Sequence, residues 1–436
     1  MTSNLPHPRA EAPLQKIFLD TAARIDGAAL VKQRAAQHNE APPSAVLAIG
    51  KVSFPMFEGF LATAPTVKKG LLVAPATRFP DNVQLPHGCL AVVSDHPNPT
   101  SRSVAAGQAA LDFVRGLGRD ESLLVLLSGG GSSLVCMPAG PLTLEEKRAA
   151  AKGLSRNGAS IGELNTVRKH LSRIKGGQLG AAARCPTKVW ALSDVVGNDP
   201  ATIASGLFSP DPTTFAQAQT LLDRLVPDAP EAVKAWLQSG VRGDRAETPK
   251  PGDGKLSHVT YEILASPEHV TEAALRCAES CGYAAGLLSQ NVESDVEALA
   301  QSYIQRALRE QSAGGKRRVF VGNGEPNIVV RGNGKGGRAT HLALLVAKGI
   351  AGLRGVAFLA AGTDDRDGSA DASGAVVDGT TWPAALAQGL DPEGTLARSD
   401  SATLLGAVGA LIKGPGTSNL LDVHLLSFDG GGNADQ

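Results

Sequence analysis

Short apolar runs recur through the first half of the chain. They lack the alternation of polar and apolar residues that is typical of a strand with one solvent-exposed face. Such runs are typical of strands buried on both faces of a parallel sheet. Helical spacing of apolar residues lies between most of them, and one helical stretch opens with Thr143 and Glu146 at capping-box spacing. Alternating strands and helices predict a doubly wound α/β domain. The runs cover residues 44–50, 70–75, 90–95, 122–128 and 188–194, and the helices residues 11–38, 102–117 and 143–158.

A second strand–helix series follows residues 239–256, a charged, Gly- and Pro-rich stretch that predicts a linker or surface loop. We therefore expect two α/β domains, a Rossmann-like one over residues 1–245 and another over residues 246–436. A cleft between two such domains is the default place for a small-molecule site. The second series has expected strands at 258–266, 317–323, 327–332 and 355–362, and expected helices near 267–281 and 293–311.

The charge balance is neutral, with 42 Lys and Arg against 42 Asp and Glu. The whole molecule therefore offers no field that attracts nucleic acid or an anionic membrane, and we expect neither as a partner. No apolar stretch is long enough to predict a membrane span, and the first twenty residues lack the apolar core of a signal peptide. Five dispersed cysteines predict reduced thiols, so we expect a cytoplasmic protein.

The fourth apolar run stops at Ser128 and continues as three glycines and two serines. Ligands of open α/β sheets bind beyond the carboxyl ends of the strands. Successive N–H groups of glycines can bind phosphate or carboxylate oxygens there, although a flexible tight turn is the alternative and the Walker pattern is absent. The candidate phosphate-binding residues are Ser128, Gly129, Gly130, Gly131, Ser132 and Ser133.

Other strand ends carry charge. Lys51 directly follows the first strand and Asp194 follows the fifth, which adds a cation and a carboxylate to the same edge of the sheet. Residues 165–177 predict a basic helix that includes Lys175. Its cations favour capture of polyphosphate charge or, equally, compensation of the dipole at a helix C-terminus.

The second half contains Gly332, Gly334 and Gly337 in the dinucleotide spacing GxGxxG. Cations inside this loop, at Lys335 and Arg338, argue against a nicotinamide site. The next strand leads into an acidic segment that begins at Asp364, either an exposed turn or a cluster that needs facing cations or Mg²⁺. Glu325 is a further candidate ligand or arginine partner. We interpret three histidines in or near the motifs, His96, His170 and His341, as structural residues and not zinc ligands.

Together, "LLSGGGSSL", "NTVRKHLSRIKGGQL", "LSDVVGNDPATIASG" and "GKGGR" followed by "GTDDRDGSADASGAVVDG" resemble the glycerate 2-kinase family, whose C-terminal half is the MOFRL domain. Some relatives carry the name hydroxypyruvate reductase. The MOFRL region would span about residues 317–428. The resemblance implies ATP-dependent phosphorylation of D-glycerate at its 2-hydroxyl, with Mg²⁺, in a cleft between two α/β domains.

By motif match, the family's active-site lysine falls on Lys51 and its MOFRL arginine on Arg338, and its glycine loop, aspartate and glutamate fall on Ser128–Ser132, Asp194 and Glu325. The chain departs from the family pattern after the arginine, where it has "GGRATH" in place of "GGRNQE". That change, at Ala339, Thr340 and His341, leaves the acceptor acid open.

Our hypothesis is a kinase with a small hydroxy-acid substrate, and we allow for a homodimer. Lys51, Arg338 and Asp194 are its expected catalytic residues, with Asp194 as the base and Asp364 as the second choice. Residues 128–133 and Lys175 would hold ATP phosphates, and Asp194, Glu325 and Asp364 would hold Mg²⁺. The alternatives are an NAD(P)H-dependent hydroxypyruvate reductase and a non-catalytic protein that binds a hydroxy acid.

Overall fold

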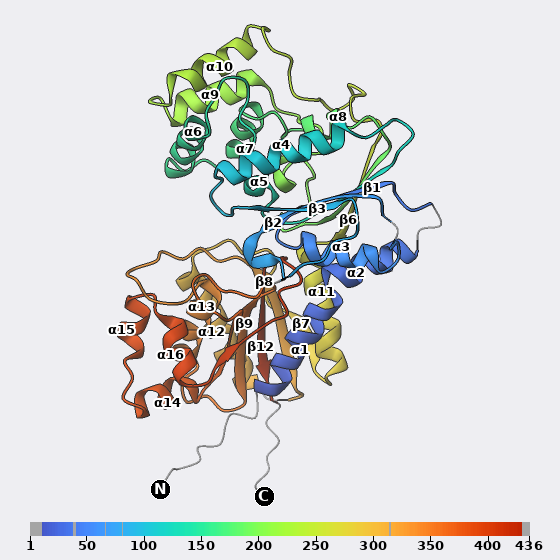
Figure 1. Ribbon diagram of the computed structural model, residues 1–436. Helices are drawn as coiled ribbons and strands as arrows, with labels where there is room; N and C mark the ends of the chain where they lie inside the picture. Colours follow the sequence, from blue (N-terminus) through green and yellow to red (C-terminus); the bar gives the residue numbers. More distant parts are fainter. Residues whose placement is uncertain (1–10, 38–40, 66, 81, 314, 430–436) are drawn as a thin grey trace, which may run out of the picture. The chain divides into compact units, whose positions relative to one another are not determined.

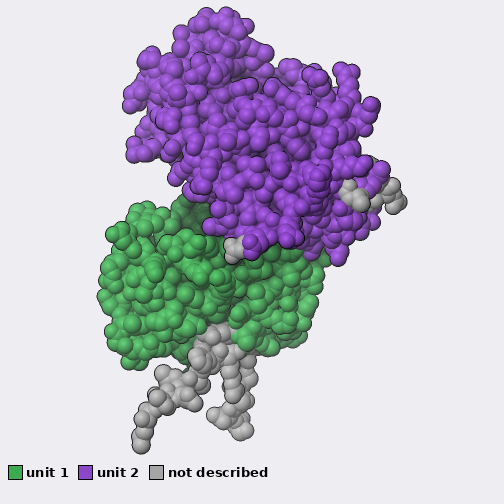
Figure 2. Space-filling view, in the orientation of Figure 1, with its two compact units in different colours: residues 1–26, 265–436 green, residues 27–264 purple. Residues whose placement is uncertain are grey.

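The computed structural model describes residues 11–37, 41–65, 67–80, 82–313 and 315–429 (Figure 1). These residues form two compact units, residues 27–264 and residues 1–26 with 265–436, as far as they are described (Figure 2). No described helix combines the length and the apolar character that crossing a membrane requires.

The unit of residues 27–264 is built on a six-stranded sheet in the order β3-β2-β1-β4-β5-β6. The pairs β3/β2, β2/β1, β1/β4 and β4/β5 are parallel, as the unalternating apolar runs predict. The strands are β1 (Ala45–Ile49), β2 (Lys69–Pro75), β3 (Cys89–Ser94), β4 (Leu123–Leu127), β5 (Thr187–Leu192) and β6 (Val259–Ala265).

Helices cover both faces of this sheet (Figure 1). Alternate residues of β1, from Ala45 to Ile49, join the core beneath α4 (Ser101–Arg115), and Val46 and Ala48 are equally buried on the face covered by α3 (Ser53–Leu61). Burial on both sides explains why the strands read as continuous apolar runs. The other helices are α2 (Gly27–Ala36), α5 (Gly131–Leu134), α6 (Leu144–Arg156), α7 (Ile161–His170), α8 (Gln178–Ala182), α9 (Phe215–Leu225) and α10 (Glu231–Val241), with 3₁₀ turns η1 (Ala76–Arg78) and η2 (Ile203–Ser205).

The other unit contains a mixed six-stranded sheet in the order β11-β10-β9-β12-β8-β7. Its last strand, β12, lies antiparallel between β8 and β9, and only the β7/β8 pair is parallel among its pairings. The strands are β7 (Ala284–Leu287), β8 (Arg318–Gly324), β9 (Val356–Gly362), β10 (Gly374–Asp378), β11 (Leu411–Ile412) and β12 (Asp422–Phe428).

The first helix of the described residues, α1 (Glu11–Arg24), belongs to this second unit. Its fully buried Leu14, Ile17 and Phe18 lie on the helix that packs against α11, β9, β10 and β12. The remaining helices are α11 (Pro267–Ser280), α12 (Val296–Ala313), α13 (Arg338–Gly349), α14 (Thr381–Ala387), α15 (Pro392–Ala397) and α16 (Ser401–Ala407).

The compact units divide the chain differently from the predicted domains. β6 is the sixth strand of the first sheet, so residues 246–264 lie with the first unit, and the expected linker at 239–256 is a segment within it. α1 joins the second unit because its apolar face is buried there. The expected cleft between two domains stays a prediction.

Two element predictions were wrong in detail. Residues 11–38 form two helices that end at Arg24 and Ala36, and residue 38 lies outside the described residues. Residues 327–332 are irregular and not a strand, with Val329 and Val330 exposed. The sequence interpretation also missed β7, β10, β11 and β12.

Candidate functional site

The strand order of the first sheet places its switch point between β1 and β4. The chain winds outward from β1 through β2 and β3 and then returns to the other side of β1 as β4. In doubly wound sheets of this order, ligands bind in the crevice at the carboxyl ends of the two strands at the switch point. Here those ends are Gly50–Lys51 and Ser128–Gly129, which are the segments that the sequence singled out.

The two strand ends are tied together by their backbones. The N–H of Lys51 donates to the carbonyl of Gly129 (2.9 Å), and the buried Ser128 hydroxyl accepts from the N–H of Val52 (3.1 Å). A Cβ on Gly50 would lie 2.1 Å from the Ser128 Oγ, so only glycine permits this approach. The strand ends thus hold Lys51 beside the glycine loop.

Gly130 is the point where Lys51 and His96 meet the loop. It has φ = +85° and precedes α5, and a Cβ there would lie 3.0 Å from His96 Cδ2 and 3.2 Å from Lys51 Cγ. Burial, and then the charges of Lys51 and Arg78, lower the pKa of His96 to about 4, so its imidazole is neutral at neutral pH. The first three strand ends therefore bring Lys51, Arg78 and His96 into one electropositive neighbourhood.

Sequence analysis missed Arg78 and assigned His96 only a structural role. Both residues follow the carboxyl end of a strand, β2 and β3 respectively, just as Lys51 follows β1. That position is the signal that could have found them, because parallel strands bring their carboxyl ends to one edge.

Lys175 lies against the loop from below. Its ammonium donates to the carbonyls of Ser132 (2.7 Å) and Val135 (3.3 Å), at the end of the short helix α5, and its side chain is buried. The Ser132 hydroxyl is also hydrogen-bonded to Ser205 (2.7 Å). The structure thus brings Lys175 together with the loop. The buried ammonium holds the loop in position and is not exposed beside it.

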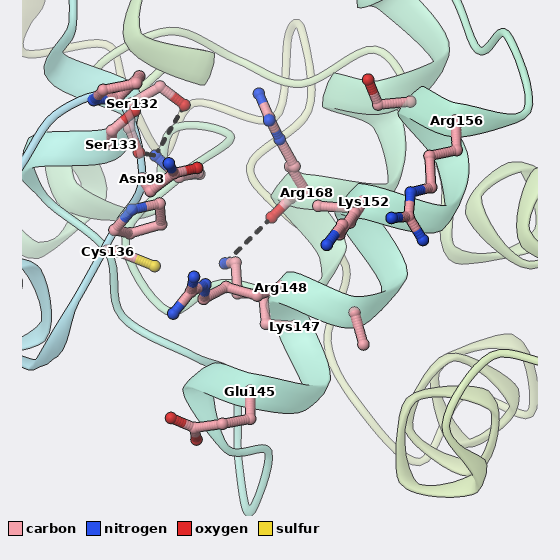
Figure 3. Close-up of a pocket in the computed structure, with 16 residues that line it drawn as sticks. Asn98, Ser132, Ser133, Cys136, Glu145, Lys147, Arg148, Lys152, Arg156 and Arg168 are labelled. Atoms are coloured by element: carbon pink, nitrogen blue, oxygen red, sulfur yellow. Dashed lines mark hydrogen bonds between the residues drawn. The ribbon is translucent and has the colours of Figure 1, made fainter. Parts of the chain in front are cut away.

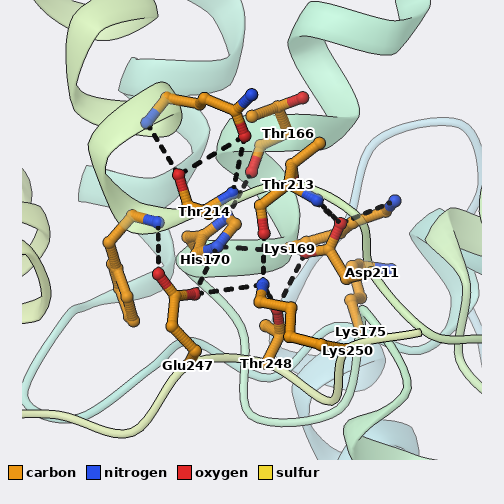
Figure 4. Close-up of polar contacts among 12 residues, drawn as sticks. Thr166, Lys169, His170, Lys175, Asp211, Thr213, Thr214, Glu247, Thr248 and Lys250 are labelled. Carbon is orange, nitrogen blue, oxygen red and sulfur yellow. Dashed lines mark hydrogen bonds and ion pairs between the residues drawn. The ribbon is translucent and has the colours of Figure 1, made fainter. Parts of the chain in front are cut away.

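The single basic helix predicted over residues 165–177 is wrong, because α7 ends at His170 and Lys175 lies in the irregular segment that follows. Lys169 is neutralised internally by the fully buried Asp211 (3.3 Å). The same buried network contains His170, whose Nε2 lies 3.2 Å from Glu247 (Figure 4). Lys169 and His170 are therefore held by contacts within the first unit.

A pocket of about 730 Å³ borders the loop at Ser132 and Ser133 (Figure 3). Its floor and wall come from α6, the end of α7 and the turn that precedes α4, all within the first unit. One carboxylate, Glu145, lines it together with six cations: Lys147, Arg148, Lys152, Arg156, Arg168 and Lys175. Sequence analysis included Arg168 and Lys175 in its basic segment but missed the four cations of α6, because they read as an ordinary solvent-exposed helix face.

Asp194 follows the carboxyl end of β5, the neighbour of β4 in the sheet, and is half-buried. Its charge and that of Asp199 add to the effect of burial, which raises the pKa of Tyr261. Asp194 is thus at the predicted edge of the sheet.

In the second unit, Arg338 is the first residue of α13 and makes two ion pairs. Its Nε donates to Asp422 Oδ2 (2.9 Å), at the start of β12, and its Nη2 pairs with Glu325, directly after β8. Burial opposes the charge on Arg338, but the two carboxylates outweigh it and raise the arginine pKa. Burial likewise raises the pKa of Asp422, while Arg338 counteracts it. Glu325 is therefore the arginine partner that the sequence allowed.

The aspartates of the acidic segment that follows β9 have different structural surroundings. Asp367 is buried and accepts from the N–H groups of Ala339 (3.1 Å) and Thr340 (2.7 Å), so it caps α13. Asp364 lies near Asp422, since a Cβ on Gly362 would be 3.4 Å and 3.3 Å from their Oδ1 atoms.

The predicted metal ligands come from both units. Glu325 and Asp364 belong to the second unit and Asp194 to the first. Over the described part of the chain, no three His, Cys, Asp or Glu side chains gather in a way that could hold a metal by themselves.

The glycine loop of the second unit does not have the context of a dinucleotide fingerprint. Thirteen residues, 325–337, separate β8 from α13, and β12 pairs antiparallel with β8. A Cβ on Gly334 would lie 2.6 Å from Asp400, and one on Gly337 would lie 2.2 Å from Asp367 Oδ1. These glycines are therefore needed for packing against the chain itself.

The residues that depart from the family pattern are buried beside Arg338. Thr340 is an N3 capping residue of α13, accepting from the N–H of Gly337 (3.1 Å) and from the hydroxyl of Ser401 (2.9 Å). Ala339 and His341 are also buried, and burial lowers the pKa of His341. The departure thus lies in the buried first turn of α13.

Comparison with known proteins agrees with this architecture. Residues 13–238 match the domain of unknown function DUF4147, and residues 318–422 match the MOFRL family. A putative hydroxypyruvate reductase of Agrobacterium vitis is 36% identical over 87% of this chain and 86% of its own length. The D-glycerate 2-kinase of Thermotoga maritima is 34% identical over 87% of this chain and 89% of its own length.

A solved structure is similar over almost the whole chain. The crystal structure of a glycerate kinase from Thermotoga maritima superimposes with a TM-score of 0.84 at 29% identity, and covers 97% of this chain and 100% of its own. The two α/β units, the order of the motifs and these likenesses over most of the chain lead to one conclusion. The chain belongs to the glycerate kinase family, with a DUF4147 domain followed by a MOFRL domain.

Proposed function

We propose that the protein is an ATP-dependent kinase that phosphorylates D-glycerate, or a closely related hydroxy acid, at the 2-hydroxyl. The observation that carries the proposal is the meeting of Lys51, His96 and the glycine loop at the switch point of a doubly wound sheet. A cation beside a glycine loop suits a transferring phosphoryl group, whose charge must be neutralised in place. The relative named D-glycerate 2-kinase supports the choice of acceptor.

In this proposal the chain's residues act mainly by position and charge. The loop of residues 128–133, whose Ser132 carbonyl accepts from the Lys175 ammonium, binds phosphate oxygens, and Lys51 neutralises the transferring group. Arg338 binds the acceptor carboxylate: its Nη1 has no partner among the described residues, and its side chain is 33% exposed. Asp194 accepts the proton of the acceptor hydroxyl.

Mg²⁺ would neutralise charge on the donor phosphates. Because Mg²⁺ usually takes one or two protein carboxylates and fills its remaining positions with phosphates and water, the lack of a three-ligand group among the described residues is compatible with it. Asp194 is the residue that we propose to hold it. Glu325 fits less well, since it is paired with Arg338.

The proposal needs Lys51 of one unit and Arg338 of the other to serve the same reaction. Closure around the substrates would exclude water and limit hydrolysis of ATP. A reductase has less support, because Gly334 and Gly337 of the glycine loop pack closely against Asp400 and Asp367 of the chain itself.

The test is release of ADP with hydroxy acids of three to six carbons, D- and L-glycerate first, followed by NMR of the product to find the phosphorylated carbon. We expect turnover with D-glycerate and the phosphate on C2. A parallel cuvette with NADH and hydroxypyruvate should show no change in absorbance. Oxidation of NADH, together with no release of ADP, would refute the kinase proposal in favour of the reductase.

A further inference from the structure

The basic pocket is defined by Lys147, Arg148, Lys152, Arg156, Arg168 and Lys175, and the proposed mechanism uses only Lys175 of these six cations. None of the six forms an ion pair with a carboxylate of the described residues. Elsewhere in the described chain most partly buried cations do have one, such as Lys169 with Asp211.

Two of the six are buried deeply. The Lys147 ammonium donates to the carbonyls of Leu171 (2.8 Å) and Arg168 (3.4 Å), and that of Lys175 to the carbonyls at the end of α5. Carbonyl dipoles satisfy hydrogen bonds but carry no counter-charge. Burying an unpaired charge is costly, and in practice the group is neutralised or paired. Burial lowers the pKa of Lys147 to about 8 and that of Lys175 to about 7.

The other cations are arranged to meet a long anion. Arg148, Lys152 and Arg156 are spaced four residues apart and thus form a row along one face of α6, and all three side chains are exposed (Figure 3). Arg168 reaches the pocket from α7. The pocket is continuous with the glycine loop, because Ser132 and Ser133 of that loop also line the pocket.

We propose that this pocket binds the phosphate chain of the triphosphate donor, with the transferring end at the loop and the chain running along α6; this rests on the proposed kinase function. A pocket of about 730 Å³ has room for a triphosphate, and its six cations outnumber the single carboxylate that lines it. No aromatic side chain lines it, so recognition there is of phosphate. A free polyphosphate has the same chemistry, and competition with ATP separates the two sources.

The experiment uses the full chain and two charge-removing variants, Lys152→Gln and Arg148→Gln, on exposed positions that keep α6 intact. Lys32→Gln is the matched control: an exposed lysine of a helix in the same unit that does not line the pocket. Binding of tripolyphosphate is measured by calorimetry, and KM values for ATP and D-glycerate by ADP release.

We expect each pocket variant to weaken tripolyphosphate binding and to raise the KM for ATP about tenfold, the effect of one lost charge-assisted hydrogen bond. KM for D-glycerate and the melting temperature should stay unchanged, and Lys32→Gln should behave as wild type. Tripolyphosphate should compete with ATP.

An unchanged KM for ATP in both pocket variants would overturn the inference while the kinase stands. Tripolyphosphate binding that is lost in the variants but does not compete with ATP would also overturn it, since the anion would then be an effector. Conversely, competitive binding of ATP and tripolyphosphate without phosphorylation of any acceptor would support the pocket and refute the proposed function.

Discussion

At the scale of single residues, Lys51 and Arg338 carry the proposed chemistry in different ways. Lys51 follows β1 directly and touches the loop at Gly130, and Arg338 is held by two carboxylates at the start of α13. A positioned charge that stabilises a transition state is worth about 100-fold or more in rate. Both residues should therefore be individually necessary.

We expect Lys51→Ala and Arg338→Ala each to lower kcat/KM for D-glycerate at least about 100-fold. Lys68→Ala and Arg354→Ala remove exposed cations from the same two units and should leave the rate unchanged. Because Arg338→Ala leaves Asp422 buried without its partner, its folding is checked by circular dichroism before the assay. Near-wild-type turnover in either variant would remove that residue from the catalytic set.

Lys147 gives a prediction on pH. An unfolded lysine titrates near pH 10.4, whereas burial lowers the folded pKa of Lys147 to about 8. Between these values the unfolded chain binds the proton and the folded chain does not, so this residue makes the protein more stable as pH rises through that window.

The measurement compares wild type with Lys147→Met by urea unfolding at pH 7.5 and pH 10. The difference in unfolding free energy, wild type minus variant, should increase with pH, by up to about 1.4 kcal/mol per pH unit. A difference that is equal at both pH values would show that Lys147 is charged in the folded protein.

At the scale of elements, the turn from β4 into α5 decides whether the site forms. Gly130 combines a left-handed backbone with close contacts to His96 and Lys51. A Cβ there would strain the backbone and would also displace the two side chains. Substituting a second glycine that has a positive φ but no close neighbours isolates the backbone effect.

We expect Gly130→Ala to lower stability by about 1–2 kcal/mol and to abolish most activity, because the methyl group pushes Lys51 away from the loop. Gly158→Ala is the control: Gly158 also has a positive φ (+76°), but nothing lies within 4 Å of its Cβ position. It should lose similar stability and keep its activity. Equal activity in the two variants would mean that the contacts at Gly130 are without consequence.

The element scale also shows where sequence patterns succeeded. β1 to β6 were predicted because strands buried on both faces have a continuous apolar signal. β7 and β11 are short, and β12 was hidden in a segment of mixed character, so no period could reveal them. α7 ends at His170 although basic residues continue, because Lys175 packs under α5 in place of extending the helix.

At the scale of the whole molecule, the first helix is joined to the last third of the chain. Phe18 of α1 is fully buried in the unit that contains β9, β10 and β12, and Leu19 beside it is 39% exposed. The second unit is therefore complete only with the N-terminal residues.

Phe18→Ala should destabilise the second unit by about 3–5 kcal/mol, the usual cost of removing a buried aromatic ring. Hydrogen exchange followed by mass spectrometry is the measurement: peptides from β9 to β12 should exchange faster, while those from β1 to β5 stay unchanged. Leu19→Ala, on the same helix, is the control and should have little effect. Faster exchange in both units alike would mean that α1 does not belong to one of them.

The sequence by itself determined the first sheet, the candidate residues at the ends of its strands and the family, because each depends on local patterns: apolar runs, glycines and short motifs. Only the tertiary structure decided that Arg78 and His96 lie near Lys51 and that Lys169 forms an ion pair with Asp211. It alone also showed that six cations of α6, α7 and their surroundings line one pocket. The reason is that charged residues tens of positions apart form no periodic pattern in the sequence. Packing alone decides whether they form ion pairs with each other or stay available to a ligand.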